Sequence, residues 1–236
     1  MPLDHPPIKA VFFDLDNTLF NQSKAHKTAI SQMKEEFKFL FDNIEENRLM
    51  EVFNGAEERA IEEFRKGKPL ITIRLNRTKE FLESLDLDVE YADEFNERFY
   101  ELYPTFDMEI EGAKQLVRDC SGNYSLGVIS NGSKGVQCKK LRALEIEDYF
   151  ENIVLSEEIG IRKPNPGIFL EAIKELEANA GECLMIGDSY HSDIVGAKEA
   201  DMKACWLNPS NNSYPEEEIV PDFGVESLDE VFEILF

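Results

Sequence analysis

The stretch Val11-Phe12-Phe13-Asp14-Leu15-Asp16-Asn17-Thr18-Leu19 decides the fold of this 236-residue chain. The apolar run that leads into it predicts a strand buried on both faces of a parallel sheet. Alternate side chains of an extended chain point the same way, so Asp14 and Asp16 can face one point. Two such carboxylates repel each other unless a cation lies between them or one holds a proton. An acidic turn is the plainer alternative, because Asp and Asn are common turn residues.

The overall charge restricts the possible partners. The chain carries 48 Asp and Glu residues against 25 Lys and Arg residues, a net charge of −23. Nucleic acids and anionic membranes both bind basic surfaces, so we expect no nucleic-acid polymer and no membrane as partner. An anionic small substrate would need cations placed locally at its site.

The cysteines and the apolar runs indicate where the protein works. Cys120, Cys138, Cys183 and Cys205 are far apart and show no Cys-x-x-Cys spacing, so we expect neither a disulfide nor a zinc site. The first residues lack the pattern of a signal peptide, and no apolar run approaches membrane-spanning length. We therefore expect a cytoplasmic protein. For its oligomeric state, we expect a monomer or a homodimer.

A helical pattern follows the opening stretch. From Ser23 to about Tyr103 the chain is rich in Glu, Lys, Phe and Leu, with few Gly or Pro residues. Apolar residues recur there at helical spacing in four groups, around Phe41, Phe53, Phe81 and Phe99. The pattern predicts about four helices whose aromatic residues form the core of a small bundle.

The rest of the chain alternates between strands and helices. Apolar strands are expected at 124–130, 153–155, 183–186 and 203–207, and helices at 135–144, 166–176 and 193–200. Such alternation is typical of a doubly wound parallel sheet. We therefore predict an α/β protein with a Rossmann-like core, residues 1–19 and 105–236, interrupted after its first strand by an inserted α-helical cap, residues 20–104.

Polar residues occur where the core strands end. Beyond Asp14 to Thr18, these are Ser130-Asn131-Gly132, Lys163-Pro164, and Gly187-Asp188-Ser189 with Asp193. Ligands of such sheets bind beyond the carboxyl ends of the strands. Each segment alone could be a turn or a helix cap. Together, several acids, a lysine and hydroxyls at one edge predict a phosphate site that uses Mg²⁺, because hard oxygen ligands hold this ion and an ammonium faces phosphoryl oxygens.

These four segments, in this order and with a helical insert after the first, resemble the motifs of the haloacid dehalogenase superfamily. The resemblance covers nearly the whole chain and is closest to members with a helical cap. It implies a phosphoryl-transfer enzyme with Mg²⁺ as cofactor and a small phosphate ester as substrate.

The resemblance also implies roles for single residues. Asp14 would be the nucleophile, and Asp16 the acid and then the base. The metal ligands would be the Asp14 carboxylate, the Asp16 backbone carbonyl and the Asp188 carboxylate. The substrate's phosphoryl group would be bound by Ser130, Asn131, Gly132 and Lys163, with Thr18 beside Asp16. Ser189 and Asp193 would contact the metal- and substrate-binding residues and not the substrate itself. Asp193 would orient Lys163 or a metal-bound water.

Asp16 separates the reaction classes within the superfamily, because the resemblance implies a second Asp for phosphoryl transfer and none for dehalogenation. A phosphatase is the expected activity, with a phosphomutase or a non-catalytic binding protein as alternatives. Ser156 to Gly160 and Cys205 to Asn208 resemble pyrimidine 5′-nucleotidase-like phosphatases. We therefore expect nucleoside 5′-monophosphates as substrates, with Phe20, Tyr100 or Phe106 as candidates for stacking on the base, and a broad sugar-phosphate phosphatase as the alternative.

Overall fold

The structure, a computed structural model, describes residues 7–174, 176–213 and 219–236. The chain divides into two compact units. One combines Met1–Gln22 with Asp107–Phe236, and the other is Ser23–Phe106.

The first unit is built on a six-stranded parallel sheet. Its strands are β1 (Ala10–Phe13), β2 (Ser125–Ser130), β3 (Asn152–Leu155), β4 (Cys183–Gly187), β5 (Lys203–Leu207) and β6 (Phe223–Val225). Their order is β3-β2-β1-β4-β5-β6, so the chain builds the sheet outward from β1 first on one side and then on the other. This arrangement confirms the predicted doubly wound α/β fold.

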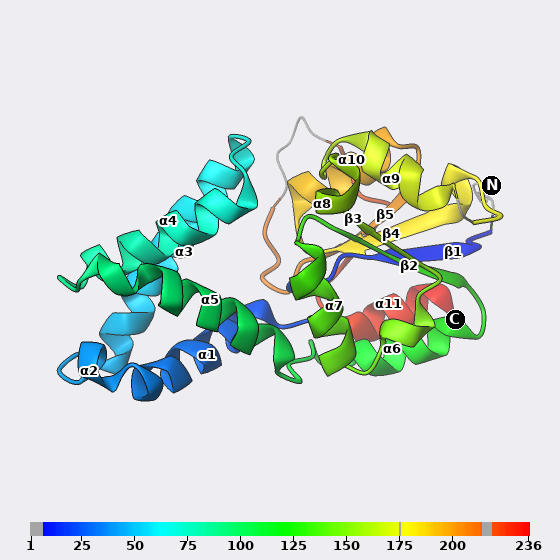
Figure 1. Cartoon of the computed structure of the whole chain (residues 1–236). Helices are drawn as coiled ribbons and strands as arrows, with labels where there is room; N and C mark the ends of the chain where they lie inside the picture. The colour runs from blue at the N-terminus through cyan, green and yellow to red at the C-terminus, as the bar shows by residue number, and fades with distance from the viewer. Residues whose placement is uncertain (1–6, 175, 214–218) are drawn as a thin grey trace. The chain divides into compact units, whose positions relative to one another are not determined.

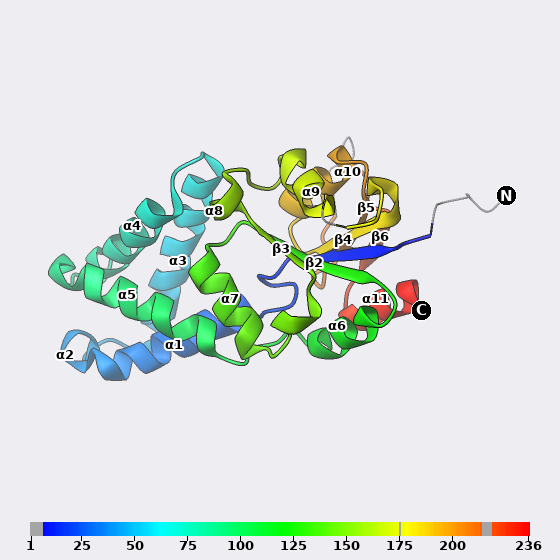
Figure 2. The ribbon, with the colours of Figure 1, turned by 45° about the vertical axis from the view of Figure 1, so that its right-hand side comes forward.

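Helices cover both faces of this sheet (Figures 1 and 2). On one face lie α9 (Pro166–Ile173) and α10 (Gly196–Glu199), and on the other α6 (Ala113–Ser121) and α11 (Leu228–Leu235). This unit also contains α7 (Lys134–Ala143), α8 (Ser156–Ile159) and a π-helical turn, Tyr190–Val195. Local sequence explains the start of α9: Asn165 caps it by accepting a hydrogen bond from the Gly167 N–H, and Pro166 occupies its first turn.

The apolar core explains why the strands are continuous apolar runs. All four residues of β1 and all five of β4 are buried, because helices cover both faces. Phe12 points to the face of α9 and α10, where it joins Phe169 and Met185 in one cluster. Gly127 on β2 admits the Phe12 ring, since a side chain on Gly127 would overlap it.

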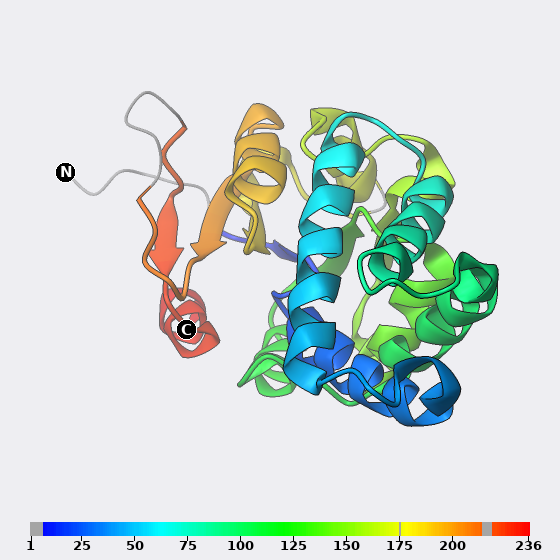
Figure 3. The same cartoon turned by 90° about the vertical axis from the view of Figure 1, so that its left-hand side faces the viewer.

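The second unit is helical (Figure 3). It comprises α1 (Gln22–Glu36) after its first residue, α2 (Lys38–Phe41), α3 (Glu46–Arg65), α4 (Leu70–Glu83) and α5 (Ala92–Leu102), and α3 lies beside α4. Its core is an aromatic cluster in which Phe81 contacts Phe41, Phe53 and Phe95. The predicted aromatic core is present, but α1 was not predicted from apolar spacing. The residues that α1 buries include two alanines and a histidine, which give a weak apolar signal.

The two chain segments that lead to and from the helical unit are hydrogen-bonded to each other. The Asn21 N–H donates to the Met108 carbonyl at 2.7 Å, and the Ile110 N–H donates to the Leu19 carbonyl at 2.9 Å. A bridge joins Phe20 to Glu109 between them. All of these residues belong to the α/β unit. The two segments that flank the insert are therefore paired with each other within this unit.

The cysteines and the helix lengths add two facts. The four cysteines are free, and three of them are buried. Among the described residues, every helix is too short or too polar to span a bilayer.

Candidate active site

The sheet order brings the predicted motifs together. Strand β1 lies between β2 and β4, with Phe13 opposite both Val128 and Ile186. The three strands are parallel, so their carboxyl ends lie at one edge, where the strand order reverses. The first residue after β1 is fixed there, because the Asp14 N–H donates to the Ile186 carbonyl at 2.9 Å.

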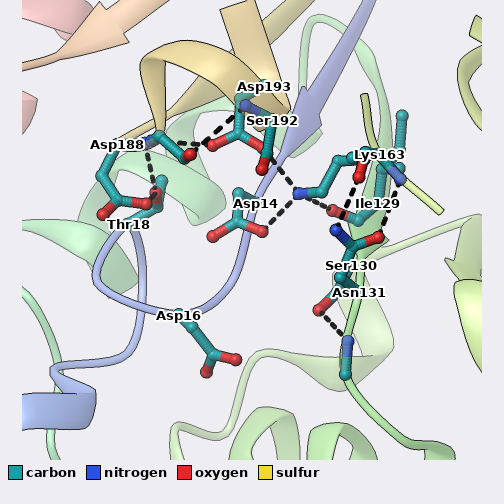
Figure 4. Close-up of polar contacts among 12 residues, drawn as sticks. Asp14, Asp16, Thr18, Ile129, Ser130, Asn131, Lys163, Asp188, Ser192 and Asp193 are labelled. Carbon is teal, nitrogen blue, oxygen red and sulfur yellow. Dashed lines mark hydrogen bonds and ion pairs between the residues drawn. The ribbon is translucent and has the colours of Figure 1, made fainter. Parts of the chain in front are cut away.

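A buried ion pair joins Lys163 to Asp14. The Lys163 ammonium lies 2.5 Å from Asp14 Oδ1 and 2.7 Å from Asp193 Oδ1, and donates to the Ile129 carbonyl at 2.7 Å (Figure 4). Lys163 is 4% exposed and Asp193 1% exposed. One ammonium is thus shared by two carboxylates that water cannot reach freely.

Asn131 holds the backbone of Lys163 in place. The Asn131 side chain donates to the Lys163 carbonyl at 3.0 Å and accepts from the Lys163 N–H at 2.8 Å. The Asn131 side chain is therefore engaged in positioning the lysine. Ser130, which precedes it, is buried, and its Oγ accepts from the Gly132 N–H at 3.1 Å.

Three carboxylates gather beside this lysine. One oxygen from each of Asp14, Asp188 and Asp193 lies within 4.8 Å of the others. Three carboxylates against one ammonium leave an excess of negative charge, and hard oxygen donors at this spacing suit Mg²⁺. The donor set therefore fits the expected cofactor, although it contains Asp193 where the sequence suggested only a supporting role.

Burial and mutual repulsion act on these groups in the absence of a metal. Burial, followed by repulsion from Asp193, raises the pKa of Asp188 from 3.8 to about 7. The pKa of Asp14 is also raised, chiefly by burial, although Lys163 opposes this shift. Burial alone would lower the pKa of Lys163, but the Asp14 and Asp193 carboxylates outweigh it and raise that pKa, so the lysine stays charged.

Two residues position the loop that carries Asp188. The Thr18 hydroxyl, fully buried, accepts from the Asp188 N–H at 3.1 Å. The indole N–H of Trp206, on β5, donates to the Asp188 carbonyl at 2.8 Å. Thr18 was expected beside Asp16 among the substrate-binding residues, whereas its hydroxyl contacts Asp188. Trp206 thus has a role at the site as well as in the core.

Asp193 is held by the same loop. Its Oδ2 accepts from the Ser189 N–H at 3.0 Å, and a side chain on Gly187 would overlap its carboxylate. Ser189 also caps the π-helical turn, because its hydroxyl accepts from the Ser192 N–H at 3.3 Å. The lack of a side chain on Gly187 therefore leaves room for the Asp193 carboxylate beside Lys163.

Asp16 lies apart from the carboxylate cluster. Figure 4 shows its carboxylate directed away from Asp14 and Asp188. It forms an ion pair with Lys140, and its Oδ2 accepts from Gln137 Nε2 at 2.9 Å. Both partners lie on α7 and are buried, at 1% and 0% exposure.

Sequence reasoning missed Gln137 and Lys140. Lys140 follows Lys139, and such a pair is typical of a solvated helix face. A signal was present, however: Gln137 and Lys140 alternate with Val136 and Leu141 on the face of α7 that is buried. Polar residues on the helix face that is otherwise apolar and buried indicate that the fold supplies polar partners for them there.

The lack of a side chain on Gly132 makes room for the side chain of Gln137. A Cβ on Gly132 would overlap the side-chain amide of Gln137, which also donates to Ser130 Oγ at 2.6 Å. The close approach thus lets one amide bridge Ser130 and Asp16.

One of the suggested base-stacking residues is not available in this structure. Phe20 is fully buried, and the Lys140 ammonium lies 5.1 Å from the centre of its ring. Phe20 is therefore not exposed for stacking on a base in this structure.

Comparisons with known proteins relate the whole chain to one group of enzymes. A family model described as haloacid dehalogenase-like hydrolase matches residues 8–201. A glyceraldehyde 3-phosphate phosphatase from Pyrococcus furiosus is 31% identical over 97% of this chain and 93% of its own length. The pyrimidine 5′-nucleotidase YjjG from Escherichia coli is 28% identical over 95% of this chain and 96% of its own. The crystal structure of the HAD-hydrolase YfnB from Bacillus subtilis shares the fold, with a TM-score of 0.84 at 22% identity over 98% and 99% of the two chains.

Proposed function

Because the chain belongs to the haloacid dehalogenase-like hydrolase family, we propose that it hydrolyses small phosphate monoesters through an aspartyl-phosphate formed on Asp14. The observation that carries this proposal is the buried Lys163–Asp14 pair, 2.5 Å apart, beside the Asp188 and Asp193 carboxylates. The pair fixes one carboxylate oxygen and keeps a buried, charged ammonium beside the place proposed for an anionic phosphoryl group.

In the first half of the reaction, Asp14 attacks phosphorus. Lys163 engages Oδ1, which leaves Oδ2 to form the new P–O bond. The bond from phosphorus to the ester oxygen breaks, and protonated Asp16 gives its proton to that oxygen. The alcohol leaves, and Asp14 carries the phosphoryl group.

In the second half, water attacks phosphorus. Asp16, now a carboxylate, accepts a proton from this water. The bond between phosphorus and Asp14 Oδ2 breaks, which restores the Asp14 carboxylate and releases inorganic phosphate. The Lys163 ammonium stabilises the equatorial phosphoryl oxygens in both steps.

We propose Mg²⁺ as the cofactor, held by the carboxylates of Asp14 and Asp188 and by the Asp16 backbone carbonyl. When bound, it would neutralise charge on the phosphoryl oxygens and reduce repulsion between the carboxylates. The related YfnB is described as bound to magnesium. Asp193 would act mainly by holding Lys163, to which it is paired at 2.7 Å.

The loop after β2 is the proposed site for the phosphoryl oxygens. Ser130 Oγ lies at its start, and Gly132 permits the close approach of Gln137 that orients this hydroxyl. Asn131 contributes by fixing Lys163 through its side chain, and its own backbone N–H is a proposed donor to phosphate.

Nucleoside 5′-monophosphates are the proposed substrates. The support is the resemblance of Ser156 to Gly160 and of Cys205 to Asn208, together with the likeness to the E. coli pyrimidine 5′-nucleotidase. Of the suggested stacking residues, Tyr100 already carries Arg74 over its ring at 4.2 Å, which leaves Phe106 as the better candidate. A second candidate is a small sugar phosphate, because the P. furiosus relative is a glyceraldehyde 3-phosphate phosphatase.

We propose that the helical unit acts as a cap that selects the substrate. It is inserted between Gln22 and Asp107, so the chain enters it seven residues after Asp16. A cap on two closely paired connections could move as a body and exclude water during the attack.

Release of inorganic phosphate from a panel of esters tests the proposal. The panel comprises uridine and thymidine monophosphates, glyceraldehyde 3-phosphate, glycerol phosphate and 4-nitrophenyl phosphate, each with Mg²⁺ and with excess chelator. We expect Mg²⁺-dependent phosphate release without any added acceptor, which also separates a phosphatase from a phosphomutase. No release from any ester at any Mg²⁺ concentration would favour a non-catalytic binding protein.

A further inference from the structure

Lys140 is a buried lysine outside the four sequence motifs. Its side chain is 1% exposed, and its ammonium forms an ion pair with the carboxylate of Asp16. The ammonium also donates to Gln22 Oε1 at 2.7 Å and lies 5.1 Å from the centre of the Phe20 ring. A buried charge that is costly to desolvate is thus placed against the residue assigned to acid–base chemistry.

Lys140 connects three points of one short segment. Asp16, Phe20 and Gln22 all belong to the stretch between β1 and the helical unit, and Gln22 is the last residue of the α/β unit there. The position of the ammonium is therefore fixed by partners on either side of it, and Lys140 cannot turn freely.

Gln137 completes the arrangement from the same face of α7. Its Nε2 donates to the second oxygen of Asp16 at 2.9 Å, so each carboxylate oxygen has a donor from this helix. The Asp16 side chain is itself 27% exposed. Without these two donors, little in the described surroundings would prevent its carboxylate from turning into water.

We propose that Lys140 is a positioning residue for Asp16: it holds the acid–base carboxylate against α7, from where Asp16 turns to the leaving group and to which it returns. This inference rests on the proposed function. Figure 4 shows Asp16 directed away from Asp14, so the side chain must turn before it can reach a leaving group beside Asp14. An acid or base acts efficiently only from a narrow range of orientations, so its anchor contributes to the rate.

The test compares two esters whose leaving groups differ in their need for a proton. Glycerol phosphate releases an alkoxide unless it is protonated, whereas 4-nitrophenyl phosphate releases a stable phenolate. The ratio of their kcat/KM values reports proton donation by Asp16, because kcat/KM covers the steps up to loss of the leaving group. We expect Lys140→Met to lower kcat/KM for glycerol phosphate on the order of tenfold more than for 4-nitrophenyl phosphate.

Further variants separate positioning from general damage to the fold. Lys140→Arg should restore most of the ratio, because it keeps the charge and the donors. Gln22→Ala, which removes a partner of Lys140 without touching Asp16, should show a smaller change of the same kind. It also serves as the second variant if Lys140→Met does not fold. Lys134→Met is the matched control on α7, since Lys134 is exposed and paired with Glu158, and it should leave the ratio unchanged.

A double variant shows whether Lys140 acts through Asp16. In an Asp16→Asn background, Lys140→Met should not change the rate at which 4-nitrophenyl phosphate phosphorylates Asp14. An equal loss on both esters, or a Lys140 effect that persists without the Asp16 carboxylate, would overturn the inference. Failure of the proposed function is distinguishable, because the unaltered protein would then hydrolyse neither ester.

Discussion

At the residue scale, the site is defined by an imbalance of charge. Asp14, Asp188 and Asp193 offer oxygens within 4.8 Å of one another, and the Lys163 ammonium is paired with two of them, Asp14 and Asp193. Burial makes this imbalance costly, because low local polarity strengthens repulsion between the carboxylates. A divalent cation would relieve the repulsion, so the stability of the folded protein should depend on both pH and metal.

This dependence has a definite sign. The pKa of Asp188 is raised to about 7 from 3.8, and that of Asp14 is raised as well. The folded protein therefore binds more protons than the unfolded chain between roughly pH 4 and pH 7, and the free energy of unfolding should fall as the pH rises through this range. Urea unfolding in excess chelator measures the effect.

Two controls belong to that measurement. Added Mg²⁺ should restore stability mainly at the upper end of the range, where the carboxylates are charged. Asp188→Asn should flatten the dependence on pH. A stability in chelator that rises steadily from pH 4 to pH 7 would contradict the charge imbalance.

At the scale of elements, strands and their following loops place the site, and helices adjust it. Trp206 illustrates this on β5, where its indole N–H donates to the Asp188 carbonyl and its ring contacts that of Tyr190. We expect Trp206→Phe to keep the packing but lose this hydrogen bond. The Mg²⁺ concentration for half-maximal activity should rise about tenfold, as is usual when a partner of a metal ligand is removed.

The outcome that matters is a shift in metal dependence with kcat at saturating Mg²⁺ nearly unchanged. Titration of activity with Mg²⁺ gives both quantities. If Trp206→Phe lowered kcat at every Mg²⁺ concentration and left the half-maximal concentration unchanged, Trp206 would not act through Asp188.

Two glycines near the start of α7 make a matched pair. A Cβ at Gly132 would overlap Gln137, whereas a Cβ at Gly135 would have nothing within 4 Å. Gly132→Ala should therefore displace the amide that bridges Ser130 and Asp16, and lower kcat/KM on the order of tenfold or more, as misplaced groups do. Gly135→Ala should leave the rate unchanged and stabilise the helix slightly. Equal effects of the two changes on kcat/KM would contradict this account.

The sequence predicted the strands better than the helices at the edges of the fold. Strand β5 was expected at 203–207 and is found there, because its apolar run is bounded by polar loops. Helices α6 and α11 and strand β6 were not predicted. The strand β6 has three residues, one of them glycine, and such a segment becomes a strand only through pairing with β5.

The same limit applies to the site. Asp14, Lys163 and Asp188 stand at strand ends or in short loops, where their residue types are informative on their own. Lys140 contacts Asp16, which lies more than a hundred residues earlier in the chain. Trp206 contacts Asp188, which lies eighteen residues earlier. Both contacts depend on which residues the fold brings together. No local pattern contains that information.

At the scale of the whole molecule, the two segments of the α/β unit that flank the insert are paired with each other and not through the insert. Asn21 and Met108 are hydrogen-bonded neighbours, so a short linker could replace Ser23–Phe106 without straining the sheet. We expect the shortened protein to fold and to hydrolyse 4-nitrophenyl phosphate slowly with Mg²⁺. It should lose the preference between nucleoside monophosphates and sugar phosphates that we propose for the complete protein.

Circular dichroism and cooperative thermal unfolding would establish that the shortened protein is folded. The ratio of kcat/KM values for uridine monophosphate and glycerol phosphate then measures the role of the helical unit. An unchanged ratio would show that the α/β unit alone selects the substrate, contrary to the proposed cap.

The central claim is that Asp14 carries the phosphoryl group during turnover. Its most direct test is to mix the protein with Mg²⁺ and 4-nitrophenyl phosphate, quench in acid within a turnover, and locate the phosphoryl group by peptide mass spectrometry. We predict an acyl phosphate on Asp14, its absence in Asp14→Asn, and a loss of turnover by orders of magnitude in that folded variant. A phosphoryl group on another residue, or turnover by Asp14→Asn at the rate of the unaltered protein, would contradict the mechanism.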